Sequence, residues 1–421
     1  MHSSNTSLTD RSELELMAPA GGWDTLSAAL ANGADSVYFG VRELNMRSLS
    51  SRAFTRACLP EVMDRIHDAG RLGYLTVNTV IFDDDAQALE QLLEAARQAS
   101  VDAVIASDVA VLMRCRALGL PVHLSTQLNI ANVEALRFYA QFADVAVLAR
   151  ELTLEQVARI TRAVRQEGIC GPSGQLMRVE MFCHGALCMA VSGRCYMSLH
   201  TRGKSANRGE CLQTCRRTYT IHDAERDIAL TLDAGTVMSP KDLKTIDFVD
   251  RMVNAGVRVF KIEGRARSAE YVQHVVSCYD AALRAACRGG ATEAEKALWN
   301  RRLGEVFHRG FWDGYYLGAQ VAALTDASGS KASLVKRHVG RCTNYFARVG
   351  VAQFVIEAEG FAKGARLLVV GPTTGAVEFE AESIVRDDAA QNEARKGESV
   401  TLTVPGRVRE NDKLYVLEPR G

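Results

Sequence analysis

The chain has 421 residues, 47% of them hydrophobic, which supports a large core and more than one structural unit. Fifty basic residues balance fifty acidic ones, so the net charge is zero. The molecule as a whole therefore does not attract nucleic acid or an anionic membrane. The start of the chain carries no secretion signal and no apolar run reaches the roughly 20 residues of a membrane span, so we expect a cytoplasmic protein without membrane association.

The first predicted elements occupy residues 13–269, after a polar stretch over 1–12 that we expect to be disordered. Short apolar runs alternate there with amphipathic stretches, which is typical of strands and helices in an α/β domain. Eight runs predict strands, the number that closes a (β/α)8 TIM-like barrel. They are LELMAPAG near Leu14, SVYFG near Val37, GYLTVNT near Leu75, DAVIASD near Val104, PVHLSTQ near His123, DVAVLAREL near Val147, RVEMFCHG near Val179 and VRVFKIEGR near Val259.

Stretches between these runs carry apolar residues at helical spacing. An open doubly wound sheet is the alternative architecture, but eight units and a typical length of about 250 residues favour the closed barrel. The predicted helices are TLSAALANG, LPEVMDRIHDAG, ALEQLLEAARQAS, VEALRFYAQF and LEQVARITRAVRQEG.

Polar residues follow the predicted strands at their C-terminal ends, where a barrel of this type places its reactive groups. Any single one could instead cap a helix or form a salt bridge at the rim, but the whole set together indicates an active site. The set comprises Arg47, Asn78, Asp108, Ser125, Gln127, Arg150, Glu151, His184, Lys261, Glu263 and Arg265.

The remaining chain predicts two further units. Residues 270–335 show helical patterns, YVQHVVSCYDAALRAACRGG and then EKALWNRRLGEVFHRGFWDGYY, and we expect a helical connector packed on the barrel. Residues 336–421 change to alternating apolar and polar residues, which predicts a small C-terminal β-barrel.

A segment at 180–219, after the seventh predicted strand, holds five of the eleven cysteines. Four of them, Cys188, Cys195, Cys211 and Cys215, form the spacing C-x6-C-x15-C-x3-C. In a chain without a secretion signal, thiolates collected in this way bind a soft metal. The spacing matches neither the paired knuckles of structural zinc nor the usual ferredoxin runs, so zinc and an iron-sulfur cluster are both open.

The same segment is locally basic. A positive loop beside thiolates would attract an anionic substrate or a phosphate backbone, although a merely solvated loop is the alternative. After Cys188 its basic residues are Arg194, Arg202, Lys204, Arg208, Arg216 and Arg217, against the single acid Glu210.

His184 precedes Cys188 by four residues, so a nucleophilic Cys-His pair is a competing interpretation of this segment. The chain has no G-x-S-x-G or H-E-x-x-H motif, and the additional thiols make a lone nucleophile the poorer account.

The stretch FCHGALCMAVSGRCYMSLHTRGKSANRGECLQTCRRTY resembles the signature of the collagenase-like peptidase family U32. The stretches ELMAPAGGWDTLSAALANGADSVYFG and MSPKDLKTIDFVDRMVNAGVRVFKIEGRARSAEYV are similar to the family as well, so the resemblance covers nearly the whole chain. Members similar to this chain include tRNA hydroxylation proteins that make 5-hydroxyuridine at the wobble position.

This resemblance implies a function and a cofactor. It implies a 4Fe-4S cluster on Cys188, Cys195, Cys211 and Cys215, prephenate or a similar anionic co-substrate, tRNA as the partner, and a paralogous family member as a further partner. Position 183 departs from the family pattern, because Cys183 stands where many relatives have an aliphatic residue. We therefore expect Cys183 to be a fifth, exchangeable thiol.

On this hypothesis the base of an anticodon loop enters the cavity at the strand ends, since a loop presents splayed bases. Proton transfer is assigned to the candidate catalytic residues His184, Glu263 and Lys261. Substrate contacts are assigned to Arg47, Asn78, Gln127, Arg150, Arg208, Arg216 and Arg265.

Two other functions stay open from the sequence. The first is a peptidase acting on collagen-like or unfolded peptides, for which the sequence shows no recognised proteolytic constellation. The second is a zinc-stabilised RNA-binding protein, against which the polar residues gathered at the strand ends argue.

Overall fold

The computed structural model describes residues 9–47, 54–223, 225, 228–231, 238–327 and 329–420. Eight parallel strands form a closed barrel, in the order β11-β1-β2-β3-β4-β5-β6-β7, and β11 pairs with β7 to complete the ring. The eight predicted strands and the barrel are thus confirmed, and the open doubly wound sheet is excluded. The strands are β1 (Glu15–Ala20), β2 (Ser36–Phe39), β3 (Leu72–Val77), β4 (Ala103–Ala106), β5 (Val122–Leu124), β6 (Val145–Val147), β7 (Arg178–Gly185) and β11 (Val259–Ile262).

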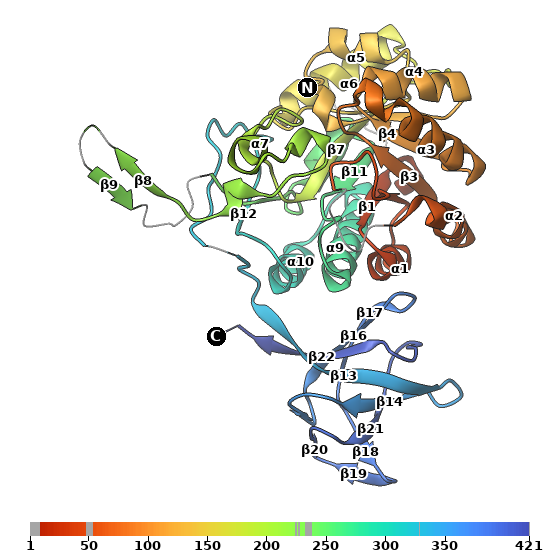
Figure 1. The fold of residues 1–421 in the computed structure, drawn as a ribbon, viewed down its shortest axis with the longest axis vertical. Helices are drawn as coiled ribbons and strands as arrows, with labels where there is room; N and C mark the ends of the chain where they lie inside the picture. Colours follow the sequence, from red (N-terminus) through yellow and green to blue (C-terminus); the bar gives the residue numbers. More distant parts are fainter. Residues whose placement is uncertain are drawn as a thin grey trace.

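Helices surround the barrel on its outer face (Figure 1). The five predicted helical stretches are helices, and α4 is an additional one. The sequence pattern missed α4 because its VAVLMRCRAL lacks a polar face, and Val109 and Met113 are exposed on it. The helices are α1 (Trp23–Ala31), α2 (Leu59–Asp68), α3 (Ala86–Gln98), α4 (Val109–Leu118), α5 (Val133–Tyr139), α6 (Leu154–Glu167), α8 (Val249–Asn254) and α9 (Ala269–Cys287).

Two hydrophobic clusters hold the barrel together. The larger lies between the strands and the outer helices, and a smaller one, which includes Met17, Tyr38, Tyr74 and Val259, fills the inside of the barrel. Because side chains fill the interior, the barrel is a packed core with a solid floor beneath its C-terminal end.

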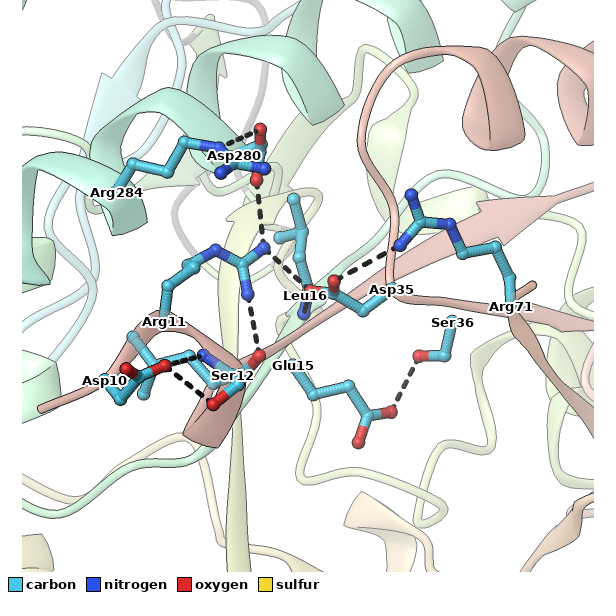
Figure 2. A network of polar contacts seen from close by, with 11 residues as sticks. Asp10, Arg11, Ser12, Glu15, Leu16, Asp35, Ser36, Arg71, Asp280 and Arg284 are labelled. Carbon is cyan, nitrogen blue, oxygen red and sulfur yellow. Dashed lines mark hydrogen bonds and ion pairs between the residues drawn. The ribbon is translucent and has the colours of Figure 1, made fainter. Parts of the chain in front are cut away.

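The N-terminal segment is anchored in part. Residues 1–8 lie outside the described residues, whereas Arg11–Glu13 form a short 3-10 helix (Figure 2). The Arg11 guanidinium donates to the carboxylates of Asp35 at 2.8 Å and Asp280 at 2.9 Å. For residues 9–12 the expected disorder is wrong, because Arg11 ties this end to the start of β2 and to α9.

A long insertion separates β7 from β11. It contains α7 (Met197–Arg202), the 3-10 turns Ala206–Arg208 and Thr214–Arg216, and the hairpin β8 (Thr220–Asp223) and β9 (Ile228–Thr231), which stands away from the barrel in Figure 1. It ends in β10 (Asp242–Lys244), which pairs antiparallel with the end of β7. The insertion therefore starts and returns at the C-terminal end of the barrel.

The helical segment after the barrel differs in part from its prediction. α9 packs against α1 and β1, so it serves as the last barrel helix. α10 (Glu293–Glu305) ends before the aromatic cluster, where Phe311–Trp312 form β12 beside β10. The helix ends because Val306, which follows it, is in the extended conformation, and Gly310 at φ +80° lies in the left-handed region just before β12.

The C-terminal residues form antiparallel sheets around a separate hydrophobic core. The larger sheet has the order β17-β16-β22-β13-β14-β21-β18-β19, and β17 packs on α1 and α9 of the barrel. In the part of the chain that the structure describes, no helix is long and apolar enough to cross a membrane. The strands are β13 (Leu334–Phe346), β14 (Val351–Ile356), β15 (Phe361–Ala362), β16 (Arg366–Gly371), β17 (Gly375–Glu380), β18 (Ile384–Arg386), β19 (Ala389–Gln391), β20 (Glu393–Ala394), β21 (Ser399–Thr403) and β22 (Lys413–Pro419).

Candidate active site

A cavity of about 230 Å³ lies at the C-terminal end of the barrel, between the strand ends and the β7–β11 insertion. Most of the residues predicted from the strand ends and the cysteine segment line it together. They are Arg47, Asn78, Ser125, Gln127, Arg150, Lys261, Glu263 and Arg265 from the barrel, with Cys188, Cys211, Cys215 and Arg216 from the insertion.

Glu263, just after β11, is the carboxylate of this cavity. The Arg47 guanidinium lies 3.3 Å from its Oε1, and the Tyr38 hydroxyl donates to Oε2 at 3.3 Å. Burial alone would raise the pKa of Glu263, but Arg47 and Arg265 outweigh burial and lower it. Glu263 is therefore an ionised carboxylate that can accept a proton or a hydrogen bond from a bound molecule.

Lys261 stands on the floor of the cavity and is tied to the barrel interior. Its Nζ donates to Glu180 Oε1 at 2.6 Å and lies 4.6 Å from the centroid of the Tyr38 ring. Glu180 has no exposed surface, and its other oxygen is 3.6 Å from His123 Nδ1. Burial raises the pKa of Glu180, but Lys261 and His123 lower it overall, so Glu180 is an ionised carboxylate inside the barrel.

The opposite wall of the cavity is polar. Asn78 Nδ2 donates to Gln127 Oε1 at 3.1 Å, and Arg150 Nη2 donates to Ser192 Oγ of the insertion at 2.6 Å. Gly193 of the insertion packs against Gln127, and its backbone has a φ of +73°. A Cβ atom at position 193 would lie 2.8 Å from the Gln127 side chain. Only glycine allows the insertion to close over this wall.

The four thiols predicted as metal ligands gather on one side of the cavity. Cys188, Cys211 and Cys215 line it, and Cys195 lies next to them. Burial raises the pKa of Cys215, Arg216 lowers it, and the charges of the other three thiols raise it further. The structure thus brings three of the four predicted ligands into one cavity, and Cys195 is close enough to Cys215 for their charges to interact.

The chemistry of these thiols defines the metal centres that they fit. Cysteine thiolates are the ligands of structural zinc ions and of iron-sulfur clusters. Cys188, Cys211 and Cys215 line the cavity beside cationic side chains, so the residues present fit either kind of centre.

Three arginines form a second cationic wall, of which only Arg216 was predicted from the sequence. Arg267 and Arg309 lie 3.6 and 3.7 Å from the buried carboxylate of Asp242, and Arg216 donates to the carbonyl of Pro240 at 2.7 Å. Arg267 follows β11 by five residues and Arg309 lies beyond α10, so counting strand ends could not find them.

Together these walls make the cavity strongly cationic. Seven of its lining residues carry a positive charge, and Glu263 is the single carboxylate among them. The cations are Arg47, Arg150, Arg216, Lys261, Arg265, Arg267 and Arg309. A space of this composition favours an anionic small molecule.

His184 does not belong to the cavity, contrary to its predicted role. Its ring is buried among Tyr271, Tyr279 and Phe311, and its Nδ1 is 3.4 Å from the Tyr279 hydroxyl. The register between β7 and β11 shifts at this point, where Phe182 pairs with Lys261 but His184 pairs with Ile262. This bulge turns His184 away from Cys188, so the two residues form no nucleophilic pair.

The burial of His184 predicts how stability depends on pH. Burial, with Lys244, His308 and Arg267 nearby, lowers the pKa of His184 from 6.5 to about 3. Between pH 6.5 and about pH 3 the unfolded chain binds a proton at His184 that the native chain does not. The free energy of unfolding therefore falls as the pH drops, by up to about 1.4 kcal/mol per pH unit. We expect His184→Gln to flatten this slope in urea unfolding measured over the acidic range. Identical slopes in both proteins would contradict a neutral, buried His184.

Two other predicted residues also lie outside the cavity lining. Arg208 pairs with the carboxylate of Asp85 and covers the Phe82 ring at 3.9 Å from the centroid. Cys183 is fully buried, and its thiol donates to the carbonyl of Lys261 at 3.4 Å. Arg208 therefore joins two loops outside the cavity, and Cys183 is a core residue instead of an exchangeable thiol.

Asp108 and Glu151, from the same strand-end set, do not line the cavity either. The Asp108 carboxylate accepts from the backbone N–H of Ala110 at 2.9 Å and so caps α4, and Glu151 is exposed. Asp108 is therefore a helix cap and Glu151 a rim residue, which were the alternatives to a role in the active site.

Comparison with known proteins adds the following findings. Residues 21–326 match the model of peptidase family U32. The chain is 49% identical over 408 residues to a protein of Porphyromonas gingivalis named collagenase, a match that covers 97% of this chain and 99% of the other.

Two further relatives carry names of RNA-modifying proteins. The tRNA hydroxylation protein P1 of Bacillus subtilis is 34% identical over 305 residues, covering 70% of this chain and 69% of the other. A 23S rRNA 5-hydroxycytidine synthase of Escherichia coli is 33% identical over 318 residues, covering 73% of this chain and 46% of the other.

Proposed function

The chain belongs to peptidase family U32, and on that premise we propose that it is an iron-sulfur enzyme that hydroxylates a pyrimidine base of RNA. The favoured substrate is the wobble uridine of tRNA, and the favoured co-substrate is prephenate. One observation carries the proposal: three of the four predicted ligand thiols and seven cationic side chains line one cavity at the C-terminal end of a barrel.

The thiol set supports an iron-sulfur cofactor. Cys188, Cys195, Cys211 and Cys215 would hold a 4Fe-4S cluster, which supplies redox chemistry when it is bound. A hydrolytic metal ion needs carboxylate or imidazole ligands and an open position for water. The described lining of the cavity offers one carboxylate, Glu263, and no imidazole.

The chain's own side chains define the other roles. The cationic walls would bind the carboxylates of the co-substrate and keep their charge away from water. Glu263, ionised and hydrogen-bonded by Tyr38, would hold or accept a proton beside the base. Asn78 and Gln127 would contact the polar edge of a pyrimidine from the opposite wall.

Arg309 provides a test of the anionic co-substrate. Burial and the neighbouring Arg216 lower the pKa of Arg309 to about 10, so it stays charged at neutral pH, and it shares the Asp242 carboxylate, 3.7 Å away, with Arg267. We expect Arg309→Gln to raise KM for prephenate roughly 10- to 100-fold with a smaller change in kcat, as for loss of a charge-assisted hydrogen bond.

The control is Arg97→Gln on α3, because Arg97 pairs with Glu94 at the surface, 2.7 Å away. Steady-state kinetics of the anaerobic holoenzyme should show an unchanged KM for this variant. If Arg309→Gln behaved like Arg97→Gln, the arginine wall would not be the co-substrate site.

The peptidase alternative rests on the name of the relative with 49% identity. The geometry favours it less, because the Cys188 thiol has no histidine partner in the cavity, and His184 is buried against Tyr279. A peptidase of the cysteine class needs that partner to activate its thiol.

The proposal is tested by nucleoside mass spectrometry of total tRNA and rRNA from cells that lack the gene. We expect a 5-hydroxylated pyrimidine to disappear and to return with the wild-type gene. An unchanged nucleoside profile in cells without a paralogue, together with gelatin cleavage by the purified protein, would replace the proposal with the peptidase.

A further inference from the structure

Exposed apolar side chains gather beside the cavity on two segments, the loop after β3 and the first half of the cysteine insertion. Of the seventeen large hydrophobic side chains exposed among the described residues, six lie in residues 80–82 and 189–199. Such a concentration on a soluble protein marks a surface for binding. The six are Val80, Phe82, Met189, Val191, Tyr196 and Leu199, and we call them the rim surface.

Hydrogen bonds join these two segments. The N–H of Val80 donates to the carbonyl of Asn207 at 3.1 Å, and Arg208 donates back to the carbonyl of Val80 at 3.1 Å. The Asn207 side chain accepts from the N–H of Cys195 at 3.2 Å. The two segments that carry the rim surface are therefore fixed to each other and to the backbone of Cys195, a predicted cluster ligand, and Cys188, Ser192 and Gly193 of the same insertion line the cavity.

The rim surface offers two flat groups to a ligand. Tyr196 is 71% exposed, and Phe82 is 55% exposed although the guanidinium of Arg208 covers one face of its ring at 3.9 Å. Arg208 is held in place by the Asp85 carboxylate at 3.1 Å. A fixed arginine-aromatic stack and an exposed tyrosine both suit the faces of nucleobases.

The charge around the rim surface selects the kind of ligand. Arg194, Arg202, Lys204 and Arg217 are exposed on the same insertion. Of the acids nearby, Glu210 is paired with Lys204 at 2.9 Å and Asp85 with Arg208 at 3.1 Å, whereas Asp83 and Asp84 are exposed next to Phe82. Aromatic groups interleaved with cations are the composition of surfaces that bind single-stranded nucleic acid, whereas apolar peptides gain nothing from the cations.

We propose that the rim surface binds a single-stranded RNA loop, with Tyr196 and the Phe82–Arg208 stack each holding a base that flanks the nucleotide in the cavity. This inference rests on the proposed function, since it assigns the docking site of the RNA substrate. It adds two positions, outside the cavity, at which the RNA loop is bound without taking part in the reaction.

The test is fluorescence anisotropy of a labelled anticodon stem-loop hairpin with the anaerobic holoprotein. We expect Tyr196→Ala and Phe82→Ala each to raise Kd about 5- to 100-fold, the range for loss of one base-aromatic stack. Tyr196→Phe keeps the ring and should bind as the wild type does. Phe138→Ala, which removes a 60% exposed ring on α5, is the matched control and should also bind normally.

The outcomes separate this inference from the proposed function. If the wild type binds the hairpin and both alanine variants bind it equally well, the rim surface is not the docking site, while the RNA substrate stands. If the wild type does not bind RNA but binds a collagen-like peptide through Tyr196, both the inference and the proposed function fail.

Discussion

Replacement of Cys211 by serine should remove most of the iron and acid-labile sulfide from anaerobically purified protein. Cys211 lines the cavity and is one of the thiols whose charge raises the pKa of Cys215. Four thiolates without a carboxylate partner form a soft-ligand site, and loss of one leaves an iron without its protein ligand. Serine variants of Cys188, Cys195 and Cys215 should lose iron in the same way.

The control variants are Cys58→Ala and Cys342→Ala, because both thiols lie away from the cavity lining. They should keep the iron and sulfide content of the wild type. Stoichiometric zinc without sulfide in the wild type would contradict the cluster, and equal iron loss in the controls would indicate general misfolding.

Removing the Glu180 carboxylate should cause the largest loss of stability that we expect from one polar substitution. Glu180 is fully buried and Lys261 is 5% exposed, so Glu180→Ala leaves an ammonium group without its partner inside the barrel. Breaking a buried ion pair in this way costs about 3–5 kcal/mol. Urea unfolding monitored by circular dichroism measures this change in the free energy of unfolding.

Two further variants show whether the unpaired charge is the cause. The double variant Glu180→Gln with Lys261→Met removes both charges and should be more stable than Glu180→Ala, because no lone ammonium remains. Glu61→Ala breaks an exposed pair with Arg65 on α2 and should cost less than about 1 kcal/mol. A Glu180→Ala protein as stable as Glu61→Ala would mean that Lys261 is not held by a buried charge pair.

Much of the barrel could be predicted because its strands are buried on both faces and therefore appear as apolar runs. The strand ends then indicated Arg47, Asn78, Gln127, Lys261 and Glu263 as neighbours, and all five line one cavity. Parallel strands end on the same side of a barrel, so position along the chain is enough for this step.

The remaining site residues depend on features that the sequence does not display. A bulge in β7 turns His184 into the core, and a one-residue shift of register reverses the direction of a side chain. The ion pair with Asp85 holds Arg208 outside the cavity lining, and Asp85 lies more than a hundred residues earlier in the chain. Arg267 and Arg309 reach the cavity from loops whose course only the folded chain defines.

The most direct test of the account is an anaerobic reaction of the cluster-loaded protein with prephenate and RNA from cells that lack the gene. Digestion and mass spectrometry of the RNA should show a pyrimidine nucleoside that has gained one oxygen atom, and none should form with the Cys211→Ser protein. The account is contradicted if the loaded protein leaves every nucleoside unchanged while the same preparation cleaves gelatin.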